Sequence, residues 1–178
     1  MSFKPILITN GEPNSIFLEI FLKAYNKKKF RSPIILISSY DLLKFNMKKL
    51  NLKFKIKKLN PKDLLKKKLD NSSINLIDIK YKFENKFQKI SKKSNKFIEK
   101  SFNVSFKIIK QGITDKFING PISKKNFLNK KYPGITEYVG KKFGVNKIAM
   151  LIYNKNLSVC PLTTHIPIKY VAKKINSK

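Results

Sequence analysis

The first fifty residues alternate between short continuous apolar runs and stretches in which apolar residues recur every three or four positions. The runs at 4–9 and 34–38 are typical of buried strands, and helices are predicted from Ser15 onward and over 41–50. Because successive strand–helix units place neighbouring strands parallel, this pattern predicts an α/β fold with a mostly parallel sheet.

The first helix is indicated by Ile16, Ile20 and Ala24, which recur at helical spacing behind a turn. We expect Asn14 or Ser15 to cap it, because a short polar side chain there can accept a hydrogen bond from a free backbone N–H of the first turn. The second helix is expected to begin behind Ser39.

The middle of the chain contains one clear helix between further strands. Strands are predicted at 54–59, 74–79 and 116–119. Ile98, Phe102, Phe106 and Ile109 recur at intervals of four and three, which predicts a helix that ends at Gly112. We interpret this stripe as core rather than as part of a cofactor site.

The last third is expected to contain short elements between loops, without an internal repeat or a linker. In order they are a helical turn over 123–129, a helix over 136–143 capped by Thr136, strands over 148–153 and 157–162, and an amphipathic piece over 167–175.

The composition is that of a chain able to bury one core, with 178 residues and 42% hydrophobic residues. It contains no apolar stretch of the roughly 18 to 20 residues that a membrane span needs, and no signal-peptide pattern at its start. The single cysteine, Cys160, excludes an internal disulfide and a cysteine zinc cluster, and we expect it to pack in a strand. A cytoplasmic location is therefore expected.

The charge is strongly positive, with 40 Lys and Arg against 10 Asp and Glu. Arg31 is the only arginine, whereas nucleic-acid binders normally use arginine to contact phosphates and base edges in a bidentate way. The lysines are spread along the whole chain, so we interpret them as a solvated surface and do not expect nucleic acid to be the main partner. An evolved polyanion-binding patch is the alternative, and the charge favours anionic substrates in either case.

Three loops in the last third carry side chains that could bind a ligand or a metal ion. They are N-G-P-I-S-K at 119–124, Y-P-G-I-T-E at 132–137 and T-T-H-I-P at 163–167. Loops at the carboxyl ends of parallel strands are where α/β proteins bind ligands. Gly120 permits close backbone approach, Lys124 offers an ammonium group for a phosphate or carboxylate, and Thr136 offers a hydroxyl at a helix start.

In this order, and with I-T-N-G-E-P-N-S-I at 8–16, the motifs resemble those of the 4-hydroxythreonine-4-phosphate dehydrogenase family. The resemblance covers the start and the last third, while 44–110 matches little beyond the order of strands and helices. It implies a three-layer α/β/α fold like that of isocitrate and isopropylmalate dehydrogenases. It also implies NAD-dependent oxidation and decarboxylation of 4-phosphooxy-L-threonine on the route to pyridoxal phosphate, assisted by a divalent metal such as zinc, magnesium or cobalt.

The resemblance assigns roles to particular residues. His165 matches the family's first metal-binding histidine, and Thr136 matches a substrate-binding threonine. Ile135 stands where the family has a substrate-contacting histidine, and an apolar side chain there cannot form a hydrogen bond. Lys124 is expected on the substrate side as a cation. Because of Ile135, an alternative is that the chain belongs to a sister dehydrogenase that acts on another four-carbon phosphorylated hydroxy acid.

One histidine cannot supply the family's three-histidine metal site, which is shared between subunits, and the six glycines form no G-x-G-x-x-G cofactor loop. Residues 1–178 are therefore expected to be the amino-terminal part of the family's chain, with the NAD-binding half absent. The expected partner is a homodimer or a complementing carboxy-terminal segment, and a homodimer by itself would bring only a second histidine to the metal site. The alternative is a truncated, non-catalytic homologue that serves as a binding or assembly subunit.

Overall fold

The computed structural model describes residues 3–66, 68–82, 92–128, 131–145, 147–163 and 166–175. The chain divides into two compact units, Met1–Lys131 and Tyr132–Lys178. The two are considered separately below.

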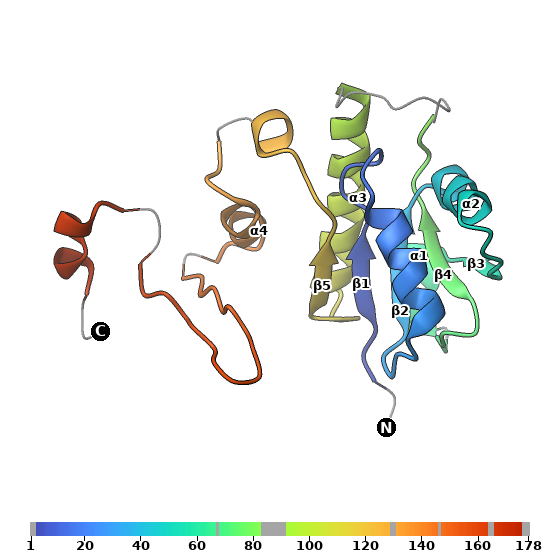
Figure 1. The fold of residues 1–178 in the computed structure, drawn as a ribbon, viewed down its shortest axis with the longest axis horizontal. Helices are drawn as coiled ribbons and strands as arrows, with labels where there is room; N and C mark the ends of the chain where they lie inside the picture. The colour runs from blue at the N-terminus through green and yellow to red at the C-terminus, as the bar shows by residue number, and fades with distance from the viewer. Residues whose placement is uncertain are drawn as a thin grey trace. The chain divides into compact units, whose positions relative to one another are not determined.

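The N-terminal unit is built on a five-stranded sheet in the order β3-β4-β2-β1-β5, in which every pair of neighbours is parallel (Figure 1). The strands are β1 (Ile6–Thr9), β2 (Ile34–Ser38), β3 (Ile56–Lys58), β4 (Ile74–Asp78) and β5 (Lys116–Asn119). The helices are α1 (Phe17–Lys27), α2 (Tyr40–Lys49) and α3 (Lys92–Lys110). The predicted strand order along the chain is confirmed.

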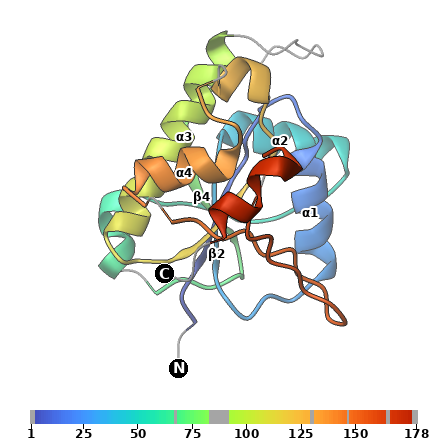
Figure 2. The same cartoon turned by 90° about the vertical axis from the view of Figure 1, so that its left-hand side faces the viewer.

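The helices cover both faces of this sheet, which confirms the three-layer α/β/α arrangement. Figures 1 and 2 show α1 and α2 on one face and α3 on the other. The central strand β2 is buried along its whole length, as expected for a parallel strand covered on both sides. Leu7, Ile35 and Ile37 of the sheet form one core cluster with Ile108 of α3.

Helix α1 lies where it was predicted, but it turns a different side to the core. Leu18, Phe21 and Leu22 are buried, whereas Ile16 and Ile20 are 70% and 54% exposed. The helix carries two apolar stripes, and the one with the bulkier, closely spaced side chains is buried because it removes more apolar surface from water.

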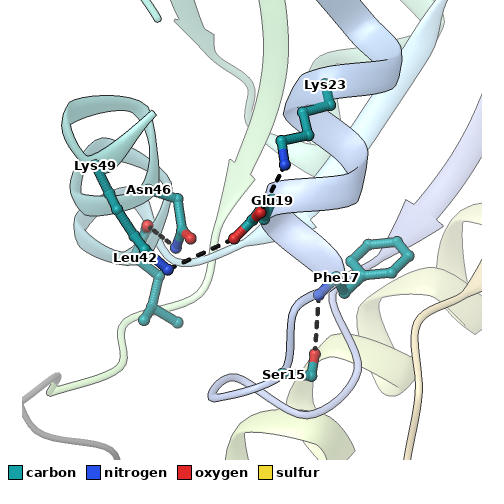
Figure 3. Close-up of polar contacts among 7 residues, drawn as sticks. All are labelled: Ser15, Phe17, Glu19, Lys23, Leu42, Asn46 and Lys49. Carbon is teal, nitrogen blue, oxygen red and sulfur yellow. Dashed lines mark hydrogen bonds and ion pairs between the residues drawn. The ribbon is translucent and has the colours of Figure 1, made fainter. Parts of the chain in front are cut away.

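Both predicted helix starts use a serine hydroxyl. The Ser15 hydroxyl accepts a hydrogen bond of 3.3 Å from the backbone N–H of Phe17, as Figure 3 shows, although Ile16 is the N-cap residue of α1. Ser39 is the N-cap of α2 and accepts from the N–H of Leu42 at 3.5 Å. The prediction for Ser39 is confirmed in full.

The two helices on this face are also linked through Glu19. Its carboxylate lies 2.8 Å from the ammonium of Lys23 on the same helix and 3.5 Å from that of Lys49 on α2 (Figure 3). These pairs lower the pKa of Glu19, the hydrogen bond from Lys23 being the largest cause.

Helix α3 confirms the predicted apolar stripe. Ile98 and Phe102 are fully buried and Phe106 nearly so, which places them in the core. The helix ends at Lys110, and Gly112 follows with φ +73°, a conformation that glycine adopts without strain.

The C-terminal unit contains α4 (Ile135–Lys142) and two single-turn 3₁₀ helices, η3 (Ile168–Tyr170) and η4 (Ala172–Lys174). The predicted strands at 148–153 and 157–162 are reduced to one antiparallel bridge between Ile152 and Val159. Cys160 is exposed, so its predicted packing in a strand is wrong.

The reason for both differences is that apolar side chains of this segment are not covered. The large exposed ones are Ile148, Met150, Leu151, Ile152, Tyr153, Leu157, Val159 and Leu162. Without a covering layer, two short apolar segments joined by a turn do not form a stable two-stranded sheet. Within the described residues, no helix is long and apolar enough to cross a membrane.

Candidate functional site

The candidate site of the N-terminal unit lies at the carboxyl ends of β1 and β5. The chain moves from β1 to β2 on one side, whereas β5 pairs with β1 on the other, in the register Ile6↔Lys116 to Thr9↔Asn119. Strand order therefore reverses at β1. In open parallel sheets, ligands bind at the carboxyl edge where the order reverses.

Two glycines let the loops after β1 and β5 cross in contact. The Glu12 N–H donates to the carbonyl of Pro121 at 2.7 Å, and the Gly120 N–H donates to the carbonyl of Thr9 at 2.8 Å. A Cβ on Gly120 would overlap the backbone of Asn10, and one on Gly11 would overlap the carbonyl of Pro121. Gly11 also has φ +68°. The predicted close approach at Gly120 is confirmed.

This crossing buries polar side chains beside it. Thr9, Asn10 and Glu12 are 0%, 1% and 7% exposed. Within the described part of the chain, neither carboxylate oxygen of Glu12 accepts a hydrogen bond of normal length and angle. Burial raises the pKa of Glu12, and the nearby Ser94 hydroxyl opposes this shift less strongly. The arrangement therefore places a buried carboxyl group beside the crossing loops at this edge of the sheet.

Glu12 was not predicted as a site residue. Its signals in the sequence are its place, as a charged residue three positions after a buried strand, and its membership of the motif at 8–16. Its burial depends on the loop at Pro121, which is distant in the sequence.

Lys124 begins the π-helical turn η2 (Lys124–Leu128) just after this crossing. The Ser123 hydroxyl accepts hydrogen bonds from the backbone N–H and the side-chain amide of Asn126, at 3.3 and 3.2 Å, and so fixes the start of the turn. Lys124 itself is exposed, as a cation for an anionic ligand must be.

Ile135 and Thr136 lie in the C-terminal unit, at the start of α4. Both are half-buried. The N-cap of the helix is Gly134, with extended backbone, so the prediction that Thr136 caps it is wrong. The helix begins one residue earlier than expected because Ile135 already has helical conformation. The Thr136 hydroxyl is therefore not needed as a cap.

Tyrosines surround this helix start. Tyr138 is 7% exposed and packs edge-on against Tyr132, with ring centroids 5.2 Å apart. The ammonium groups of Lys141 and Lys142 lie over the rings of Tyr132 and Tyr138 at 5.7 and 5.6 Å. The loop at 132–134 is thus held against the helix that carries Thr136.

The predicted metal ligand His165 lies outside the described residues, as does Thr164. Among the residues the structure does describe, no group of three or more His, Cys, Asp or Glu side chains could hold a metal ion. Catalytic zinc sites generally have about three protein ligands. The described residues therefore do not form the implied metal site by themselves.

The sheet order and the ligand-suited edge define an α/β protein of the three-layer, parallel-sheet class. The family model described as "Pyridoxal phosphate biosynthetic protein PdxA" matches residues 29–178, and the chain belongs to this family.

Curated relatives agree with this assignment, and a solved structure agrees with the fold. The 4-hydroxythreonine-4-phosphate dehydrogenase of Sulfurihydrogenibium sp. is 30% identical over 97% of this chain and 53% of its own length. That of Campylobacter fetus is 30% identical over 100% and 53%. The Burkholderia phymatum enzyme structure has a TM-score of 0.83 at 21% identity, over 98% of this chain and 54% of its own, which shows the fold. The chain spans about half the length of these relatives.

Proposed function

We propose that this chain is the amino-terminal part of an NAD-dependent, metal-assisted dehydrogenase that oxidises and decarboxylates 4-phosphooxy-L-threonine on the route to pyridoxal phosphate. The observation that carries the proposal is the family match over 29–178, together with relatives named 4-hydroxythreonine-4-phosphate dehydrogenase along nearly the whole chain. The NAD-binding residues would lie in a carboxy-terminal half outside these 178 residues, and the location would be cytoplasmic.

The chain's own residues would act on the substrate side. Thr136, half-buried at the start of α4, would donate its hydroxyl hydrogen to a substrate oxygen. Lys124, exposed at the start of η2, would place a positive charge beside the phosphate or carboxylate. Ile135 would supply an apolar contact next to Thr136.

His165 would be one ligand of a divalent metal, zinc, magnesium or cobalt. The described residues do not complete a ligand set, and a second copy would add only one more histidine, so the other ligands would come from a complementing carboxy-terminal segment. The uncovered apolar side chains of 148–162 support such a partner, since a surface of this kind is normally buried against another chain or domain.

The test is complementation in solution. The chain is mixed with the carboxy-terminal half of the Campylobacter fetus relative, and NAD reduction is followed with 4-phosphooxy-L-threonine. We expect activity that His165→Ala abolishes and Thr136→Ala lowers, while Ser158→Ala, an exposed hydroxyl of the same unit, leaves it unchanged. Equal metal affinity in the wild type and His165→Ala would show that His165 is not a metal ligand. Full activity of Thr136→Ala would show that Thr136 does not bind the substrate.

A sister dehydrogenase is the second candidate, and Ile135 favours it. An isoleucine cannot form the hydrogen bond that a histidine forms, so the preferred substrate would have a different polar group at that point. A panel of four-carbon phosphorylated hydroxy acids, assayed with the complemented wild type and Ile135→His, decides between the two. A shift of preference toward 4-phosphooxy-L-threonine in Ile135→His would support the sister enzyme.

The net charge of +30 favours a third candidate, a non-catalytic binding or assembly subunit for anionic partners. Its test is nucleic-acid binding at increasing salt. Affinity that disappears by physiological ionic strength, without sequence preference, would identify the lysines as a charged surface only.

A further inference from the structure

A small pocket opens between the segment that follows β4 and the first turns of α3. Its volume is about 210 Å³, and it is lined by Lys80, Tyr81, Lys82, Lys93, Lys96, Phe97 and Lys100. Five of these seven residues are lysines and none is acidic.

The floor of this lysine pocket is aromatic and its rim is cationic. Tyr81 and Phe97 are 6% and 2% exposed, and their ring centroids lie 5.2 Å apart. The five lysines are exposed, so their ammonium groups are available to a ligand.

Among the residues that the structure describes, this clustering of positive charge is unfavourable. Lys93, Lys96 and Lys100 lie on one face of α3, where like charges three and four residues apart repel each other. The first turn of α3 contains no acidic residue, and Glu99, the only acidic residue of the helix, does not line the pocket. None of the ion pairs found between described residues involves these five lysines. A bound anion would offset the repulsion.

We infer that the lysine pocket binds a small phosphate monoester, with its phosphate among the lysine ammonium groups and its carbon atoms against Tyr81 and Phe97. Lysine ammonium groups bind phosphate as point charges. The volume lies below the roughly 300–1,000 Å³ typical of cofactor and drug-sized sites, which favours a phosphate with a short carbon chain.

The pocket is separate from the proposed catalytic function. None of Lys124, Ile135, Thr136 or His165 lines it. It lies after the carboxyl end of β4, away from the point at β1 where the strand order reverses. A binding measurement therefore tests it whether or not the chain is part of a dehydrogenase.

The experiment is isothermal titration of the purified chain with inorganic phosphate and with glycerol 3-phosphate. The pocket variant is Lys93→Gln/Lys96→Gln. The control, Lys27→Gln/Lys107→Gln, removes the same charge from exposed positions outside the pocket. Circular dichroism checks that both variants fold.

We expect saturable binding with one site per chain. The pocket variant should bind at least about tenfold more weakly, because it removes two of the five positive charges that surround the phosphate, while the control should stay within about twofold. Tighter binding of glycerol 3-phosphate than of inorganic phosphate would support contact with the rings.

Equal weakening in both variants would overturn the inference, because binding would then follow net charge alone. Absence of saturable binding would overturn it as well. A nucleic-acid strand is the competing occupant. If an oligothymidylate binds more tightly than glycerol 3-phosphate and loses affinity mainly in the pocket variant, the lysines belong to a nucleic-acid surface.

Discussion

Replacing Gly120 with alanine is expected to separate the two loops that cross at the carboxyl edge of the sheet. The new Cβ would overlap the Asn10 carbonyl group and lie 3.0 Å from the Thr9 carbonyl oxygen. These atoms belong to backbone, so they cannot move aside as a flexible side chain would. The substitution therefore forces the chain itself to shift.

The size of the effect follows from what the shift breaks. Overpacking in a tight contact costs about 1–3 kcal/mol, and each of the two crossing backbone hydrogen bonds contributes about 0.5–1.5 kcal/mol. We expect Gly120→Ala to lower the free energy of unfolding by about 3 kcal/mol. Gly112→Ala is the matched control, because Gly112 has φ +73° but a Cβ added there would meet no described atom within 4 Å. Its cost should be about 1–2 kcal/mol, from backbone conformation alone.

The assay is urea unfolding followed by circular dichroism, since the chain contains no tryptophan. An effect of Gly120→Ala no larger than that of Gly112→Ala would show that the crossing loops are not tightly held, and the close backbone contact at the site would be wrong.

Three further predictions concern the same unit. Leu22→Ala should lower the free energy of unfolding by about 2–5 kcal/mol, because Leu22 is fully buried. Ile20→Ala should lower it by less than about 0.5 kcal/mol, because Ile20 is 54% exposed. Similar losses for the two variants in urea unfolding would contradict the assigned buried face of α1. Ser39→Ala should cost about 1 kcal/mol by removing the cap of α2, and an unchanged free energy of unfolding in urea would refute the cap's role. The pKa of Glu12 is raised in the folded state, so the free energy of unfolding of the wild type should fall relative to that of Glu12→Gln as the pH rises from 4.5 through the folded-state pKa. A difference in the free energy of unfolding that does not change with pH would refute this.

Features that depend on local sequence were predictable. The uninterrupted apolar run of β2 and the serine before α2 determine a buried strand and a capped helix through neighbouring residues only. The stripe of α3 contains large side chains at strict helical spacing, so its burial followed directly. The close approach at Gly120 was predictable because a glycine in a loop after a strand has no Cβ to keep another backbone away.

Features that depend on distant contacts were not predictable. Two apolar stripes on α1 compete, and the sheet selects Leu22 over Ile20. The apolar segments at 148–153 and 157–162 predict strands, but their formation needs a covering layer that the sequence pattern does not reveal. Glu12 is buried by a loop more than a hundred residues away. His165 stays a prediction, based on the resemblance of its flanking motif.

The pairing of β1 with β5 has a consequence for how the chain is made. Ile6 pairs with Lys116, so ribosomes adding about 5–20 residues per second need roughly 5 to 22 s after making the first strand to produce its partner. During that interval β2 can pair with β1 on one side, but the other edge of β1 stays open. The loop crossing that shapes the candidate site is therefore completed only late in the synthesis of this unit, and a nascent chain that stalls before Gly120 exposes a strand edge able to pair with other chains.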